Sequence, residues 1–399
     1  MKNDSLFAFF AVFSVAFAFG VISPILPFFL THLKLEGFML GLFFSGFSLG
    51  RILITPVVAK ISDKYNKFVL IILGLLLFSI ATYLYTIFLL NKYVIILLRL
   101  TQGIGASMVI PTSLAVFGEN TRKGKEGTSS GIFSFSFSLG MGTGPLISGV
   151  IATKYGIKEV FILSTIMSTI SLIAISIRTL MKKFKSERKI GFVKKEKISF
   201  ELSELFRDLR MFSLFLTRFC MAVGRTSIFI FFPILASQFK MSYAGIGVFI
   251  TFMSILGAIF QLLFGKIADK LGGKFHVFII VGLLTLALTT YSLSLTKNKV
   301  MLAALFILGG LSTGMITPST TAISIQLSRE KKNAFGGVMG IVNWGTSVGI
   351  VTGSFLLSIV EKAFGLKTTF LVASIIILLP TFLIFAEFFH NGKERRRGF

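Results

Sequence analysis

Four arginines lie within long apolar stretches of this 399-residue chain, at Arg51, Arg99, Arg218 and Arg225. A charged side chain at such a position is costly unless it has a partner or faces a wet cavity. Every Asp and Glu, by contrast, falls in a segment that we expect to be a loop, a tail or a helix end. Guanidinium groups without buried carboxylates are natural partners of carboxylate or phosphate groups, which they hold with two parallel hydrogen bonds. We therefore predict an electropositive cavity and a substrate that is anionic or carries an acidic group.

The spacing of these arginines bears on where they point. Arg218 and Arg225 are seven residues apart and share one helix face, while Arg51 lies about 18 Å along a helix from Asp63, near mid-membrane. The alternative is that some of them bond to helix carbonyls or extend towards an interface, above all Arg51 and Arg225. Both interpretations remain open from the sequence.

Other polar residues offer few further contacts. Gln261, Asn343 and Trp344 are candidates for the cavity, although isolated amides in membrane helices also join helices to one another, and a Trp at this depth could belong to the core. We find no set of residues spaced for catalysis and no metal-ligand cluster. These observations favour a protein that is not an enzyme.

The composition places the chain in a bilayer. With 54% hydrophobic residues, 47 Phe and 14% charged residues, it has more apolar surface than a soluble core of this length buries. We predict an all-α integral membrane protein with twelve transmembrane helices, the first of them retained rather than cleaved as a signal peptide. The predicted spans are 6–30, 37–59, 67–89, 93–117, 129–153, 159–180, 209–236, 243–266, 274–295, 300–326, 336–360 and 366–389.

The net charge of +25 is distributed unevenly. Lys and Arg concentrate in loops on the side that holds both termini and the polar segment 181–208, which predicts a cell membrane protein with both termini cytoplasmic. This distribution argues against nucleic-acid binding. We expect a monomer whose partners are the lipid bilayer and a small-molecule substrate. The basic segment 181–208 is either a tether or a surface that docks onto anionic lipid headgroups.

The chain contains an internal duplication. A charged loop at 59–67 recurs at 265–274, and Pro27 matches Pro233 at an offset of 206, with other matches at offsets up to 209. We predict an N-terminal six-helix bundle (1–180), a linker (181–208) and a C-terminal six-helix bundle with a basic tail (209–399). Two pseudosymmetric bundles with matching hinge loops are typical of a transporter.

The loop residues carry a resemblance to the major facilitator superfamily, which extends over essentially the whole chain. The second copy resembles the superfamily's loop motif at Gly265, Asp269, Lys270, Gly272 and Lys274. The first copy retains Asp63, Lys64 and Lys67, but Ala59 and Asn66 replace glycines. Asn tolerates a left-handed backbone better than most residues, so we expect Asn66 to preserve the turn.

The resemblance implies that these loops form a cytoplasmic gate. Asp63 would meet the helix start near 333–336, and Asp269 the helix start near 127–130, where free N–H groups favour negative charge. Such contacts would stabilise the outward-facing state. The alternative is a basic turn that only sets topology.

Two helices add to the resemblance. Arg99, Gln102, Gly103 and Gly105 resemble the superfamily's fourth-helix pattern, and Phe306 replaces Arg99 in the second half. The fifth-helix residues Gly140, Gly144, Pro145 and Gly149 resemble the pattern that the superfamily associates with drug and metabolite antiporters, with Ser148 in place of one glycine. This second pattern favours export over uptake.

We therefore predict a secondary active transporter that moves a small organic solute across the cytoplasmic membrane by alternating access. Export with proton antiport is the coupling that the resemblance implies, with an ion gradient in place of a cofactor. Without a buried acid, the proton would have to bind Glu119, Asp63 or the substrate itself. The alternative is an organic-anion or sugar-phosphate importer or facilitator, which the arginines favour. A membrane-embedded enzyme lacks convergent catalytic groups, and a sensor or scaffold would not need two hinge loops.

Overall fold

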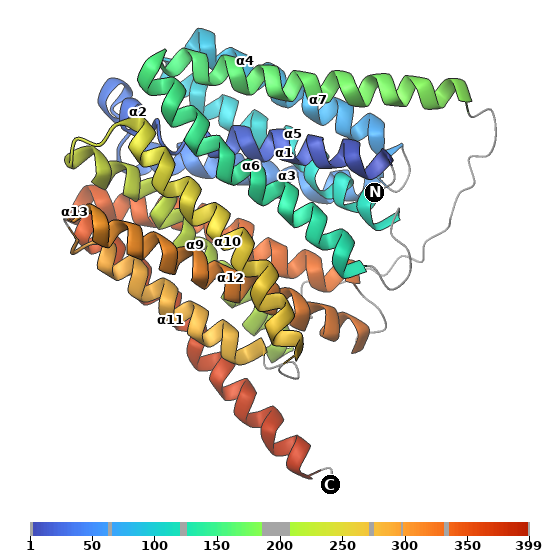
Figure 1. Cartoon of the computed structure of the whole chain (residues 1–399), viewed down its shortest axis with the longest axis vertical. Helices are drawn as coiled ribbons and strands as arrows, with labels where there is room; N and C mark the ends of the chain where they lie inside the picture. Colours follow the sequence, from blue (N-terminus) through green and yellow to red (C-terminus); the bar gives the residue numbers. More distant parts are fainter. Residues whose placement is uncertain are drawn as a thin grey trace. The chain divides into compact units, whose positions relative to one another are not determined.

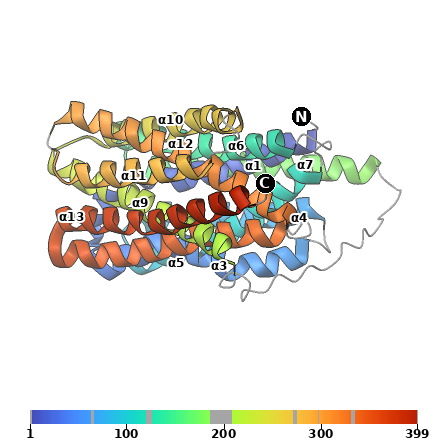
Figure 2. The ribbon, with the colours of Figure 1, turned by 90° about the horizontal axis from the view of Figure 1, so that it is seen from below.

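The structure is a computed structural model, shown in Figures 1 and 2. The described part of the chain consists of helices joined by short turns. The described residues are 3–62, 66–119, 126–185, 208–270, 275–296, 298–330 and 335–397. Their helices are α1 (Asn3–Gly20), α2 (Leu26–Leu33), α3 (Gly37–Ser62), α4 (Lys67–Phe88), α5 (Lys92–Glu119), α6 (Glu126–Lys154), α7 (Ile157–Lys185), α9 (Leu209–Gln238), α10 (Tyr243–Lys270), α11 (Phe275–Leu293), α12 (Lys299–Glu330) and α13 (Phe335–Arg397).

The first predicted membrane helix, 6–30, is broken in the structure. α1 ends at Gly20, the chain turns through residues 21–25, and α2 begins at Leu26 with a proline in its first two positions. Pro24 and Pro27 have no backbone N–H, so a continuous helical ladder cannot run through this segment. The chain uses short-range turns instead, such as Leu26 N to Ser23 O at 3.3 Å. The prediction of one unbroken span was therefore wrong.

The last two predicted spans, 336–360 and 366–389, both lie in α13. Gly365 interrupts this helix with φ 78° and ψ 174°, a backbone conformation that L side chains rarely adopt. The kink therefore lies between the two predicted spans. α13 accounts for both of them.

The helices are long and apolar enough for a membrane. Ten helices in the described part of the chain could each cross a bilayer by length and hydropathy, and the shorter apolar helix Asp4–Gly20 continues through the turn into α2. With α13 counted as two segments, the described helices account for all twelve predicted spans. The predicted all-α membrane fold is thus confirmed.

The internal duplication is visible as repeated packing contacts. A methyl group added to Gly140 would lie 2.5 Å from the carbonyl oxygen of Phe13, and one added to Gly349 would lie 2.3 Å from that of Phe219. The two contacts are related by offsets of 209 and 206 residues. Gly74 likewise packs on the carbonyl of Gly105 as Gly282 packs on that of Ser312. The same close helix approaches therefore recur in the two halves, as a duplicated unit requires.

By its packing, the chain divides into two compact units. The first holds α1 to α7 together with Pro233–Ser254, which is the end of α9 and the start of α10. The second holds the remainder of α9 and α10 together with α11 to α13. α7 continues to Lys185, beyond the predicted end of the N-terminal bundle (Figure 1), and the linker residues 186–207 lie outside the described part of the chain. The predicted domain boundaries stay a prediction.

Candidate functional site

The Arg99 side chain is sealed inside the first unit. It lies on α5, is 1% exposed, and its guanidinium carbon is 5.1 Å from the ring centre of Phe19 on α1. Phe43 and Phe47 of α3 place their ring centres at 5.4 Å. Aromatic faces attract a cation electrostatically, and a desolvated contact of this kind contributes about 2 kcal/mol. Three phenylalanines therefore surround a charge that the sequence alone leaves without a partner.

A directed chain of hydrogen bonds holds the same guanidinium. Arg99 Nη1 donates to Gln102 Oε1 at 3.2 Å, and Gln102 Nε2 donates to Thr82 Oγ1 at 2.9 Å. The Thr82 hydroxyl donates in turn to the carbonyl of Phe78 at 2.7 Å, so its oxygen is free to accept the amide proton. This order sets the orientation of the Gln102 amide. Gln102, predicted to line the cavity, joins α5 to α4 and is itself 1% exposed.

Arg218 lies in the second unit and joins α9 to α12. Its Nη2 group donates to the hydroxyl of Thr321 at 2.8 Å and to the carbonyl of Thr317 at 3.2 Å. The side chain is only half-buried. From the sequence, a hydrogen bond to a helix carbonyl was the alternative to lining a cavity. Arg218 makes such a bond through its Nη2 group. Its Nε atom is buried without a hydrogen-bond partner among the described residues, and the assignment of Arg218 to the cavity stays a prediction.

Arg225 and Arg51 are also partly buried. The guanidinium carbon of Arg225 is 5.9 Å from the ring centre of Phe229, one helical turn further along α9. Arg51 lies on α3, and its Nε atom is buried without a hydrogen-bond partner among the described residues. Partial exposure is what a cavity-lining cation needs. The assignment of both side chains to the cavity stays a prediction.

Of the remaining residues predicted to line the cavity, Gln261 and Trp344 have described side chains and Asn343 does not. Gln261 lies on α10 and is partly buried, while the side chain of Asn343 is outside the described part of the structure. Trp344 on α13 is 39% exposed and packs its ring against Phe215 at 5.9 Å between centres. That exposure excludes the core alternative for Trp344. Its role in a cavity wall stays a prediction.

Most of the predicted gate residues lie outside the part of the chain that the structure describes. Asp63, Lys64 and Lys274 are not described, and Asp269 and Lys270 are placed only as backbone at the end of α10. Asn66 is described, and it has φ −63° and ψ 120° rather than a left-handed conformation. Its side chain caps α4 by accepting a hydrogen bond from Phe68 N at 3.0 Å, beside Lys67 at the first helical position. The backbone of Asn66 is therefore extended and not left-handed as expected, and because residues 63–65 lie outside the described part of the chain, the survival of the turn stays a prediction.

The fifth-helix motif is divided between two packing surfaces of α6. Gly140 and Gly144 face α1, where added methyl groups would lie 2.5 Å from Phe13 O and 2.6 Å from Phe17 O. Gly149 and the backbone carbonyl of Pro145 instead face the start of α10, while the Pro145 ring lies against Gly20 of α1. A methyl group on Gly149 would lie 2.3 Å from Tyr243 O, and one on Gly247 would lie 2.2 Å from Pro145 O.

A hydrogen bond reinforces this second surface. The Ala244 backbone N–H donates to the hydroxyl of Thr153 at 3.1 Å. Ala244 lies near the start of α10, where the first orphan N–H groups of a helix need an external acceptor. The motif therefore closes two helix pairs within the first unit, α1 with α6 and α6 with α10.

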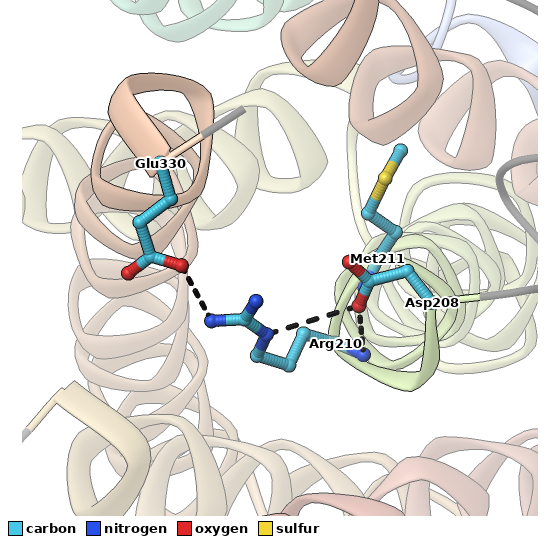
Figure 3. A network of polar contacts seen from close by, with 4 residues as sticks. All are labelled: Asp208, Arg210, Met211 and Glu330. Carbon is cyan, nitrogen blue, oxygen red and sulfur yellow. Dashed lines mark hydrogen bonds and ion pairs between the residues drawn. The ribbon is translucent and has the colours of Figure 1, made fainter. Parts of the chain in front are cut away.

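Two ion pairs between described helices could not be predicted from the sequence. Arg178 of α7 pairs with Asp4 of α1, and its guanidinium carbon stands 3.4 Å from the ring centre of Phe68. In the second unit, Arg210 Nη1 donates to Glu330 Oε2 at 2.6 Å across α9 and α12 (Figure 3). Asp208 lies 3.8 Å from Arg210 Nε and caps α9 by accepting from the Arg210 backbone N–H at 2.9 Å. The partners of each helix-to-helix pair are more than a hundred residues apart, so no local pattern reveals them.

The duplicated fold agrees with a comparison to known families. The sequence model of the Major Facilitator Superfamily matches residues 8–217 and again residues 214–398. The chain belongs to this superfamily. Its members are transporters and not enzymes, and this one is a multi-pass membrane protein.

Relatives and solved structures of the superfamily resemble the chain over most of its length. Multidrug resistance protein 2 of Bacillus subtilis is 28% identical over 354 residues, which cover 86% of this chain and 85% of that protein. An uncharacterised transporter of Methanocaldococcus jannaschii is 27% identical over 360 residues, covering 88% and 90%. The inward-facing, unoccupied structure of a bacterial homologue of the human lysosomal transporter Spinster has a TM-score of 0.76 at 14% identity, with 97% of each chain covered.

Proposed function

We propose that this superfamily member exports a small organic solute with an acidic group by alternating access. The observation that carries the proposal is Arg218, a half-buried guanidinium within a membrane helix whose hydrogen bonds to Thr317 and Thr321 engage only Nη2. Because a buried arginine stays charged, it favours a ligand that brings a carboxylate or phosphate. Within the same unit, Arg225 supplies further positive charge at a partly buried position, and Gln261, Asn343 and Trp344 are the other residues that we propose for the cavity. Arg51 is a further partly buried arginine, in the first unit.

The proposed direction rests on the relatives and on α6. The Bacillus subtilis relative is named for multidrug resistance, which is an export function. Gly140, Gly144, Pro145 and Gly149 carry the antiporter-like motif, and proton antiport is the coupling that we propose with it. Both termini lie on the cytoplasmic side in this proposal, and the loops of Asp63 and Asp269 form the gate on that side.

A ligand panel tests the substrate class. Purified protein is melted in the presence of matched compounds, each an organic acid, its methyl ester and an amine of similar shape. A ligand that binds only the folded state raises the melting temperature, so the acids should stabilise and their esters should not. Stabilisation by the amines alone would contradict the proposed substrate.

Import of an organic anion or a sugar phosphate is the second candidate. The arginines favour it as strongly as they favour export of an acid. Everted membrane vesicles separate the two directions, because an exporter accumulates labelled acid inside them when a proton gradient is applied. Accumulation only in right-side-out vesicles would favour the importer.

A further inference from the structure

Arg99 has unused hydrogen-bonding capacity inside the packed helices of the first unit. Its Nη1 group is engaged by Gln102, but Nε and Nη2 are both buried and have no hydrogen-bond partner among the described residues. A buried polar group left without a partner costs free energy, and such groups in folded proteins usually have one. We therefore expect a ligand to accept hydrogen bonds from the Nε and Nη2 groups of Arg99.

The identity of the two free groups indicates what that ligand is. Nε and Nη2 form one edge of the planar guanidinium, and their N–H bonds point in nearly the same direction. This edge donates two parallel hydrogen bonds to an anion, most favourably to the two oxygens of a carboxylate. A single halide ion can also accept from both donors.

The surroundings favour an anion over a neutral ligand. Phe19, Phe43 and Phe47 place their rings around the guanidinium, and they carry no acceptor that could satisfy its edge. The hydrogen-bond chain from Gln102 through Thr82 to Phe78 holds the opposite side of the group in place. The free edge is thus preorganised, which lowers the cost of binding.

We propose that the Nε and Nη2 edge of Arg99 is a binding site for a small anion within the first unit, separate from Arg218 in the second. The anion is either a carboxylate, including that of a transported acid, or a free inorganic ion. Binding of a transported acid rests on the proposed function, whereas binding of a free inorganic ion does not. Because Arg99 is 1% exposed, the ion is enclosed by the packed helices when it is bound.

The test is a melting experiment on the full-length protein in detergent at constant ionic strength. A thiol-reactive fluorophore reports unfolding, since the one cysteine of the chain, Cys220, is buried in the folded state. Potassium acetate, nitrate, chloride and bromide are compared with potassium gluconate, whose polyhydroxylated chain makes it much bulkier than the other anions. We expect a concentration-dependent rise in melting temperature with acetate and nitrate if the site prefers two oxygens, and with chloride and bromide if it holds halide.

Variants assign the effect to Arg99. Arg99→Lys keeps the charge but loses the two-donor edge, so the anion concentration for half the effect should rise roughly tenfold or more. Arg99→Gln should lose the effect. Arg178→Gln, which removes an arginine of the same unit that is already paired with Asp4, should retain it. An equal effect in wild type and Arg99→Lys would overturn the proposal, as would no rise over gluconate in wild type.

A measurement without variants covers the case in which both Arg99 variants fail to fold. Anomalous diffraction from wild-type crystals grown in bromide, with a parallel structure in nitrate, should place one of these anions against Nε and Nη2. Neither anion at that edge would overturn the proposal. Because Arg218 and transport do not enter either experiment, a failure of the proposed function leaves this test unaffected.

Discussion

The Nη2 group of Arg218 donates a 2.8 Å hydrogen bond to the hydroxyl of Thr321, which joins α9 to α12 in the second unit. The same nitrogen reaches the carbonyl of Thr317 at 3.2 Å, beside the helix proline Pro318. Arg99, in contrast, is enclosed by phenylalanine rings in the first unit. The two halves therefore use their arginines differently, although their helices pack in the same way.

Replacing Arg218 should remove the preference for acids. In Arg218→Gln the ligand's carboxylate loses a charged partner, so we expect at least roughly tenfold weaker binding of an organic acid and unchanged binding of any neutral ligand. The affinity is measured by ligand-dependent melting. Arg178→Gln is the matched control, because Arg178 is already paired with Asp4, and it should keep acid binding at a lower melting temperature.

Gly247→Ala should separate α6 from α10. The added methyl group would lie 2.2 Å from Pro145 O, and because backbone cannot give way as a flexible side chain does, we expect a cost of about 1–3 kcal/mol. Gly245→Ala on the same helix is the control, since its methyl group would meet only side-chain atoms at 3.5 Å and beyond. Thermal melting compares the two. Equal melting temperatures for the two variants would show that this close approach is absent.

The Asp4–Arg178 pair should stabilise the protein more than the Arg210–Glu330 pair. The side chains of Asp4 and Arg178 are 23% and 10% exposed, whereas those of Arg210 and Glu330 are 41% and 55% exposed. Solvent weakens exposed pairs, which contribute about 0–1 kcal/mol. A double-mutant cycle on each pair, with Asp→Asn, Glu→Gln and Arg→Gln changes, measures the two coupling energies. A larger coupling for the exposed pair would refute the ranking.

Both termini should lie in the cytoplasm. Cys220 is buried, so a cysteine introduced at a loop position dominates labelling of intact cells by a membrane-impermeant maleimide. Tyr155→Cys, between α6 and α7, should react from outside, while Asn66→Cys, before α4, should react only after the membrane is permeabilised. The opposite labelling pattern would reverse the topology.

Much of the fold can be predicted from the sequence because it depends on local and periodic features. Apolar runs identify the membrane segments, and glycines repeated at offsets near 206 identify the contacts that both halves share, as in Gly140 and Gly349. The break in the first helix was missed although Pro24 and Pro27 were visible, because hydropathy continues through them. The expected left-handed backbone of Asn66 is absent because its side chain caps α4, which requires an extended backbone at that residue.

The site is harder to predict because it depends on contacts between distant segments. The arginines are evident from the sequence, but the rings around Arg99 come from α1 and α3, and the partners of Arg218 come from α12. Asp4 and Arg178 are 174 residues apart. Only the packing of the helices brings these groups together, so their pairing could not be read from spacing.

Transport by the purified protein in liposomes shows whether the arginines of α9 move an acidic solute. A labelled organic acid and a cationic dye of similar size are compared under an imposed proton gradient, with wild type and with the Arg218→Ala, Arg225→Ala double variant. We expect gradient-dependent movement of the acid by wild type and its loss in the double variant. Movement of the cationic dye alone, unchanged in the double variant, would rule out an acidic substrate bound by these arginines.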